Sequence, residues 1–132
     1  MAAYKRIVLK LSGETLAPEN KSGSFDAARV DRAAQAIIAL SDMGVQVGVV
    51  IGGGNIWRGR FSEDMNPVNA DQMGMLGTVI NCLAMRDAVQ RAGGKAVVMS
   101  AIEMPRVCEV YNTQNAIKHM KKGHVTLFAG GS

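Results

Sequence analysis

The sequence predicts an α/β fold, a three-layer αβα sandwich with a mainly parallel sheet. Short runs rich in branched aliphatic residues alternate with longer segments whose apolar residues recur at helical spacing, in the order β-α-β-α-β-α-β. Three of the aliphatic runs end directly in glycine. An alternating order of this kind favours parallel strands joined by right-handed crossovers, with helices on both faces of the sheet.

The first part of the chain predicts a strand, a loop and a helix. Lys5–Leu11 is rich in branched aliphatic residues and predicts a buried strand. The polar segment Glu14–Phe25 contains proline, glycine, asparagine and serine, and predicts a mobile flap or a hairpin. Asp26 or Ser24 can cap the helix that follows, and Gly44 signals its end. The expected apolar face of this helix consists of Val30, Ala33, Ala34, Ile37, Ile38 and Leu40.

The second part of the chain continues the alternation. Val45–Ile51, Lys95–Met99 and Val125–Ala129 predict three further strands. Asn69–Ala92 and Asn112–Lys122 predict helices, and each is followed by glycine. The middle of the longer helix is apolar nearly all round, whereas a surface helix shows one apolar stripe. We therefore expect the sheet to cover one of its sides and a second subunit to cover the other.

Length and composition indicate one globular domain. The chain has 132 residues, of which 48% are hydrophobic and 20% charged, which fits a soluble protein with a buried core. The longest nearly apolar stretch, Met73–Met85, is too short to span a membrane, and no secretory signal is recognisable. Cys82 and Cys108 form neither a metal-binding spacing nor a disulfide framework. A reducing, cytoplasmic location is expected by default.

The charge of the chain is mildly basic, with a formal net charge of +4. This charge is compatible with an ordinary surface and with attraction of anionic substrates. The basic residues are dispersed and aromatic residues make up only 5% of the chain, so the sequence does not indicate a nucleic-acid-binding protein.

Glycine turns are expected to meet at one edge of the sheet. Ser12-Gly13, Gly52-Gly53-Gly54 and Gly130-Gly131 each follow a predicted strand, and Lys10 and Arg58 lie near two of these turns. Parallel strands would bring the turns together at their carboxyl ends, where open α/β sheets bind ligands. Backbone amides in such turns can bind an anion, although a tight turn that needs small residues remains an alternative for the triplet alone. The combination predicts a phosphate-handling site.

The glycine triplet matches neither of two common nucleotide-binding fingerprints. It lacks the lysine and the spacing of a Walker A loop. Trp57 occupies the third glycine position of G-x-G-x-x-G, which disfavours a dinucleotide-binding domain.

Several side chains have both a functional and a structural interpretation. Lys10 can neutralise charge on a transferred phosphoryl group, or simply extend into solvent at the sheet edge. Arg58 can bind phosphate or remain a surface residue. Asp71 can accept hydrogen bonds from a ribose, or complement the dipole in the first turn of its helix. His119 and His124 have no evident partner and are interpreted as surface or capping residues. No catalytic triad and no metal-ligand cluster can be assembled from the sequence.

Four motifs carry a resemblance to a known family. They are Lys10–Glu14 (KLSGE), Val49–Asn55 (VVIGGGN), Asp71–Leu76 (DQMGML) and Leu83–Ala88 (LAMRDA). In these motifs, and along its whole length, the chain resembles the bacterial uridylate kinase (UMP kinase) family of the amino acid kinase superfamily. The resemblance implies an enzyme that transfers the γ-phosphate of ATP to UMP, giving UDP for pyrimidine nucleotide synthesis, with Mg²⁺ entering bound to ATP.

The resemblance also implies roles for individual residues. Lys10, Leu11, Ser12 and Gly13 would line the ATP phosphates, with Lys10 supporting transfer. Gly54 and Arg58 would contact ATP, whereas Gly53 and Asp71 would contact UMP. Ser132 stands where the family has a threonine that begins a further UMP-binding stretch, and Arg86 matches a position near the GTP effector site.

The family is typically a hexamer that GTP activates and UTP inhibits. Ala17–Phe25 departs from the glycine-rich loop linked to that activation in some members. Residues 1–132 would be the N-terminal, UMP-binding part of a uridylate kinase-like domain, little more than half of the family's chain, with the C-terminal side of the fold absent. We therefore expect this chain by itself to be inactive. Two alternatives are a superfamily kinase acting on a carboxylate or carbamate and a non-catalytic anion-storage module with the same fold.

Overall fold

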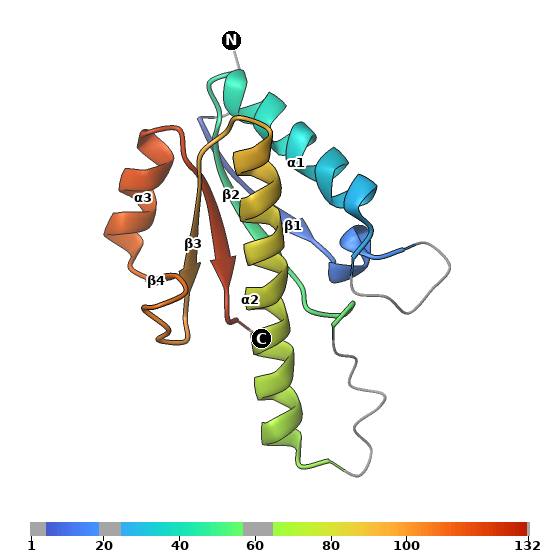
Figure 1. The fold of residues 1–132 in the computed structure, drawn as a ribbon. Helices are drawn as coiled ribbons and strands as arrows, with labels where there is room; N and C mark the ends of the chain where they lie inside the picture. The colour runs from blue at the N-terminus through green and yellow to red at the C-terminus, as the bar shows by residue number, and fades with distance from the viewer. Residues whose placement is uncertain (1–4, 19–24, 57–64, 132) are drawn as a thin grey trace.

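The α/β fold expected from the sequence is present. The computed structural model describes residues 5–18, 25–56 and 65–131. In chain order, its elements are β1 (Arg6–Leu11), the 3₁₀ helix η1 (Gly13–Leu16), α1 (Ala27–Asp42), β2 (Gln46–Ile51), α2 (Pro67–Arg91), β3 (Ala96–Ser100), β4 (Glu109–Val110), α3 (Thr113–Lys121) and β5 (Val125–Ala129). The strands form one five-stranded sheet in the order β1-β2-β5-β3-β4 (Figure 1).

Every strand pair in this sheet is parallel. β1 and β2 pair along their whole length, from Arg6 opposite Gln46 to Leu11 opposite Ile51. β5 comes last in the sequence but lies in the middle of the sheet, between β2 and β3. The carboxyl ends of β1, β2 and β5 are therefore neighbours, and the glycine turns that follow them leave the sheet at the same edge.

Different helices cover the two faces of the sheet. α1 and α2 lie beside each other on one face (Figure 1), and the core beneath them includes Val30, Ala34, Ile37, Val47, Val49, Ile51, Val79, Cys82, Met85, Val89, Val98 and Leu127. Gly48 lies on the opposite face because side chains alternate along a strand. A Cβ atom there would lie 2.8 Å from Phe128 Cε2 and 3.2 Å from the Met120 Cε atom of α3. Helices on both faces, as predicted from the sequence, are thus confirmed.

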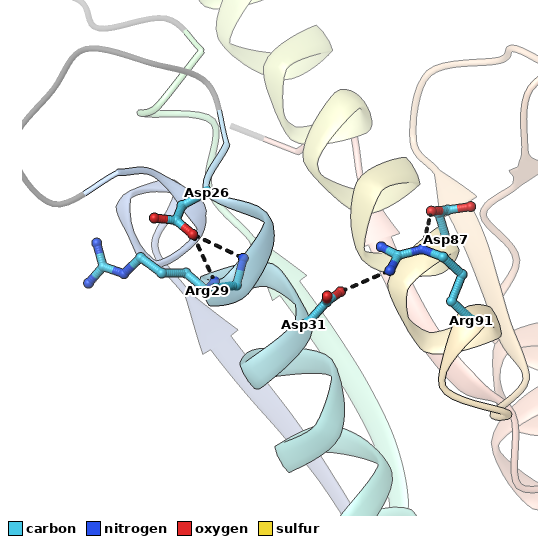
Figure 2. A network of polar contacts seen from close by, with 6 residues as sticks. Asp26, Arg29, Asp31, Asp87 and Arg91 are labelled. Atoms are coloured by element: carbon cyan, nitrogen blue, oxygen red, sulfur yellow. Dashed lines mark hydrogen bonds and ion pairs between the residues drawn. The ribbon is translucent and has the colours of Figure 1, made fainter.

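Polar contacts fix the start of α1 and its place beside α2 (Figure 2). The Asp26 carboxylate accepts hydrogen bonds from the backbone N–H groups of Ala28 and Arg29, which confirms Asp26 as the helix cap. Arg91 of α2 donates to Asp87 of its own helix at 2.8 Å and to Asp31 of α1 at 3.1 Å. These ion pairs are exposed to solvent, so they contribute little to the stability of the fold.

The long helix α2 begins two residues earlier than predicted, because Asn66 caps it and Pro67 occupies its first turn. Its amino-terminal turns extend beyond the carboxyl ends of the strands (Figure 1). One side of α2 is buried against the sheet and α1, as expected. The other side exposes Met73, Leu76 and Ile80, whose relative exposures are 39%, 43% and 42%. That a second subunit covers this side stays a prediction.

The structure departs from the sequence prediction at two segments. The start of the predicted flap or hairpin, Glu14–Phe25, is instead the 3₁₀ helix η1, because Leu16 is apolar and fully buried in the core. Residues 19–24 of the predicted flap, including the alternative helix cap Ser24, lie outside the described part of the chain. The short edge strand β4 was not predicted, since two exposed residues carry no hydrophobic periodicity. Within the described residues, no helix is long and apolar enough to cross a membrane.

Candidate active site

The first two glycine turns touch each other at the carboxyl edge of the sheet. The Gly52 N–H donates a hydrogen bond of 2.9 Å to the carbonyl oxygen of Leu11. A Cβ atom at Gly13 would overlap the side-chain oxygen of Asn55, and would lie 2.8 Å from Gly52 O and 2.9 Å from Gly54 N. Only glycine allows this approach, so the convergence of these two turns is confirmed.

The glycine triplet also packs directly on the backbone of α2. A Cβ atom at Gly53 would lie 2.7 Å from the carbonyl oxygen of Gly74 and 3.1 Å from the backbone nitrogen of Thr78. Gly53 is absent from the positive-φ glycines of the described residues. The requirement for glycine at this position is therefore steric and comes from the helix, rather than from an unusual backbone conformation.

The third turn is attached to the same helix. Gly130 has a φ of 80° and follows β5. Its N–H donates a 2.7 Å hydrogen bond to the hydroxyl oxygen of Thr78, and that hydroxyl donates to Met75 O at 2.6 Å. All three turns thus lie at one edge, two of them against α2 and the first against the second.

A buried amide joins the triplet to α2 a second time. Asn81 is fully buried, and its Nδ2 atom donates to Gly52 O and to Asn55 Oδ1, each at 2.6 Å. Its own side-chain oxygen accepts from Asn55 Nδ2 at 3.1 Å. The turn that starts at Gly52 is therefore held by both its backbone and its last side chain.

Lys10 and Asp71 lie on opposite sides of this edge. Lys10 is exposed in β1 opposite Val50, and it lies on the α3 face because the neighbouring Leu9 and Leu11 pack against the core under α1 and α2. Asp71 is exposed in the second turn of α2, so its interpretation as a first-turn charge is not supported. Its i, i+3 spacing places it on the same face of α2 as Gly74, which Gly53 contacts.

The other predicted site residues are distributed as follows. Leu11 is partly buried against the core, and Ser12 is exposed, with its hydroxyl 3.2 Å from that of Thr15. Gly54 has open space where a Cβ atom would lie. Arg58 and Ser132 lie outside the described residues.

The fold and the converging turns agree with a match to one family. The model of the amino acid kinase family matches residues 5–132. The chain belongs to the amino acid kinase family.

The names of individual relatives are more specific than the family. The chain is 52% identical to a uridylate kinase of Vibrio campbellii over 132 residues, which cover 98% of this chain and 54% of that protein. The fold is similar to the crystal structure of a UMP kinase from Bacillus anthracis, with a TM-score of 0.92 and 38% identity over 98% of this chain and 54% of that one. The structure of an isopentenyl phosphate kinase shares the fold at a TM-score of 0.63 and 16% identity, covering 95% of this chain and 54% of that one.

The chain spans about half the length of the relatives it matches, 54% in the Vibrio protein. In this member of the amino acid kinase family, the described residues present one edge of a sheet with its glycine turns.

Arg86 lies away from the glycine turns. It lines a cavity of about 440 Å³ together with Arg106 and Cys108, and its guanidinium donates to Val107 O at 3.4 Å. Burial, and to a smaller extent the nearby Cys108, raises the pKa of the Cys82 thiol to about 12. Neither thiol forms a disulfide.

The two histidines are not the partnerless surface residues expected from the sequence. His119 Nε2 lies 2.7 Å from the Glu109 carboxylate of β4, and its ring stacks on that of His124 with centroids 5.8 Å apart. Burial lowers the pKa of His124, and the nearby His119, Lys95 and Lys122 lower it further. The prediction that His119 lacks a partner was wrong, because β4, which supplies Glu109, was not recognised, whereas the position of His119 in the last turn of α3 is compatible with the predicted capping role.

Sequence reasoning did not identify Thr78 and Asn81 as part of this edge. A signal was present, because Asp71, Gly74, Thr78 and Asn81 follow one another at spacings of three, four and three residues. Such spacing marks one face of a helix. Small and polar residues along one face of an otherwise apolar helix indicate a close approach of other backbone.

Proposed function

We propose that the whole protein transfers the γ-phosphate of ATP to UMP, giving UDP and ADP. The observation that carries this proposal is the close approach of the Gly13 turn, the Gly52–Gly54 triplet and α2 at the carboxyl edge of a parallel sheet. Backbone approaches of this kind leave amide groups available to phosphate oxygens. The 52% identity to a uridylate kinase supports UMP as the acceptor.

Each side of the edge would bind one nucleotide. In this proposal Lys10, Leu11, Ser12, Gly13, Gly54 and Arg58 bind ATP, and Gly53, Asp71 and Ser132 bind UMP. Support for the UMP side comes from Asp71, which lies one turn before Gly74 on the helix face that Gly53 contacts. A carboxylate there can accept hydrogen bonds from the two ribose hydroxyl groups.

The main catalytic contribution of the protein would be to stabilise the negative charge of the transferred phosphoryl group. Phosphoryl transfer spreads negative charge over the oxygens of the migrating group, and positioned amides and cations stabilise it. Lys10 would supply a cation from the strand next to the glycine triplet. Among the described residues no group of three histidine, cysteine or carboxylate side chains could hold a metal ion. We therefore assign Mg²⁺ to the ATP phosphates, with which it would enter.

A coupled ADP-release assay of the whole protein across nucleoside monophosphates tests this function. UMP should react well and CMP poorly, and comparable rates with CMP would contradict the assignment. Lys10→Met should lower kcat by about 10²-fold or more, because a preorganised charge at the reacting group is lost. Lys118→Met, at an exposed lysine of α3, is the control and should leave the rate unchanged.

Asp71→Asn separates UMP from other acceptors. If the carboxylate holds ribose, the KM for UMP should rise about tenfold while the KM for ATP stays constant. An amino acid kinase that acts on a carboxylate or carbamate would not show this effect with its own acceptor. A non-catalytic anion-storage module would show no turnover in any variant.

Assembly and regulation belong to the same proposal. The exposed side of α2, with Met73, Leu76 and Ile80, supports association with further copies of the chain, and a hexamer is the expected form. Two arginines, Arg86 and Arg106, and one carboxylate, Glu109, line the cavity, and this excess of positive charge supports GTP as an activator there, with UTP as an inhibitor. Both cysteines are free, which agrees with a reducing compartment such as the cytoplasm.

Residues 1–132 would form the N-terminal, UMP-binding part of the kinase domain. The chain spans 54% of the length of its Vibrio relative, and the remainder would complete the nucleotide pocket. We therefore expect the 132-residue chain alone to release no ADP in the presence of UMP and ATP. Turnover by this purified chain at an ordinary kinase rate would contradict that expectation.

A further inference from the structure

Asn81 is a polar residue in a place where the fold by itself calls for an apolar one. Its neighbours along α2, Val79, Cys82 and Met85, belong to the hydrophobic core, and Asn81 is itself fully buried. Burying an amide is unfavourable unless its hydrogen bonds are made. The side chain of Asn81 makes three, and all of them go to the turn that follows β2.

The orientation of this amide is unambiguous. The carbonyl oxygen of Gly52 can only accept a hydrogen bond, so the atom 2.6 Å from it must be the Nδ2 donor. The Asn81 oxygen then faces the Asn55 Nδ2 atom, and the two side chains exchange hydrogen bonds of 2.6 and 3.1 Å. Asn81 therefore forms hydrogen bonds with both the first and the last residue of the turn, Gly52 and Asn55.

The same pair determines where the first glycine turn can lie. The Asn55 side-chain oxygen occupies the space next to Gly13, where a Cβ atom would overlap it. A change in the Asn55 side chain would therefore alter the packing of the Gly13 turn against the triplet. Asn81 is thus connected to the Gly13 turn through the side chain of Asn55.

We propose that Asn81 is a positioning residue of the phosphate-handling edge. It holds the Gly52–Asn55 turn in the register at which Gly53 meets α2 and Gly13 meets Gly54, so that the backbone amides of both turns face one anion. This inference rests on the proposed function for the identity of the ligand, a nucleotide phosphate. The mechanical part, that Asn81 sets the conformation of the turn, stands without it.

A purely structural role and a positioning role of Asn81 predict different effects of its substitution. If the residue only stabilises the core, its replacement should act like that of any buried neighbour. If it positions the turn, the near-isosteric Asn81→Asp should disturb the turn selectively, because a carboxylate oxygen would replace the Nδ2 donor opposite Gly52 O. A displacement of about 1 Å at such a site can change reactivity by about 10²-fold.

Amide hydrogen exchange of the whole protein provides the direct test. Exchange at Gly52 and Ile56, whose N–H groups donate to Leu11 O and Gly53 O, should accelerate at least about tenfold relative to strand β5 in Asn81→Asp. Cys82→Ala is the matched control, since Cys82 is the next residue of α2, is equally buried and donates instead to Phe128 O. This variant should destabilise the whole chain and leave the relative exchange of the turn unchanged. Equal relative exchange in the two variants would overturn the proposal.

Ligand titrations separate this inference from the proposed function. In the whole protein, inorganic phosphate, ATP and UMP should each bind the Asn81→Asp variant about tenfold more weakly than the unmodified protein, and Cys82→Ala should bind them normally. If the whole unmodified protein binds phosphate but neither nucleotide, the proposed function fails, while the exchange experiment still decides the role of Asn81.

Asn55→Ala keeps the inference testable if Asn81→Asp does not fold. Asn55 is only partly buried, so its truncation disturbs the core less. It should accelerate exchange in the same turn. In the double variant with Asn81→Ala, the acceleration should be well below the product of the two single effects, because both remove one shared contact. Independent, multiplying effects would contradict a shared role.

Discussion

Thr78 of α2 and Gly130, the residue after β5, are joined by a 2.7 Å hydrogen bond in which the Gly130 N–H donates to the threonine hydroxyl. Thr78 is buried, and its hydroxyl passes a 2.6 Å hydrogen bond on to Met75 O. The bond connects residues 52 positions apart in the chain. It attaches the turn of the central strand to the same helix that holds the glycine triplet.

Thr78→Val should therefore destabilise the protein. Valine has the shape of threonine but leaves the buried Gly130 N–H without its acceptor, which costs about 1–3 kcal/mol of the free energy of unfolding. Urea denaturation measures this change. Thr78→Ser retains the hydroxyl and serves as the control. A valine variant as stable as the serine variant would show that the hydrogen bond is unimportant.

Gly53→Ala should be far more harmful than Gly54→Ala. The new Cβ atom at position 53 would lie 2.7 Å from Gly74 O, a backbone atom of α2 that cannot move by itself, whereas at position 54 it would meet open space. Overpacking of this kind costs about 1–3 kcal/mol. Thermal unfolding of both variants provides the measurement, and equal melting temperatures would mean that the turn does not pack on the helix.

The stability of the protein should fall as the pH decreases through the titration of His124. Burial, followed by His119, Lys95 and Lys122, lowers the pKa of this side chain in the folded state. The unfolded chain then binds the proton first, so the contribution of His124 is complete above the unfolded pKa of about 6.5 and is lost as the pH falls below it. Urea midpoints between about pH 5 and pH 8 should show this slope, and His124→Gln should flatten it. An unchanged slope in the variant would assign the effect to other groups.

Cys82 should resist alkylation in the folded protein. Its pKa is raised to about 12, first by burial and then by Cys108, so almost no thiolate exists at neutral pH. In a Cys108→Ser background, iodoacetamide should label Cys82 only at the rate at which the protein unfolds, and rapidly in urea. Labelling at the rate of a free thiol under native conditions would contradict the burial of α2 against the sheet.

The sequence predicted those parts of the candidate site that depend on local pattern. The strand that ends at Leu11 and the strand that ends at Ile51 were recognised from their aliphatic composition, and the glycines after them from turn chemistry. Parallel pairing then places both turns at one edge, and Gly13 does touch Gly54. The positions of Arg58 and Ser132 lie outside the described residues, so their roles stay predictions.

By itself, the amino-acid sequence determined the alternation of strands and helices and favoured their parallel arrangement, because side-chain periodicity and turn chemistry are properties of neighbouring residues. Its motifs carried the resemblance to the family. Only the tertiary structure showed β5 at the centre of the sheet, Glu109 beside His119, and Asn81 bonded to Asn55 across 26 residues of chain. Contacts of that kind depend on which elements pack together. The role of a buried asparagine on an apolar helix depends on which backbone segment it bonds, and local residue spacing does not specify that segment.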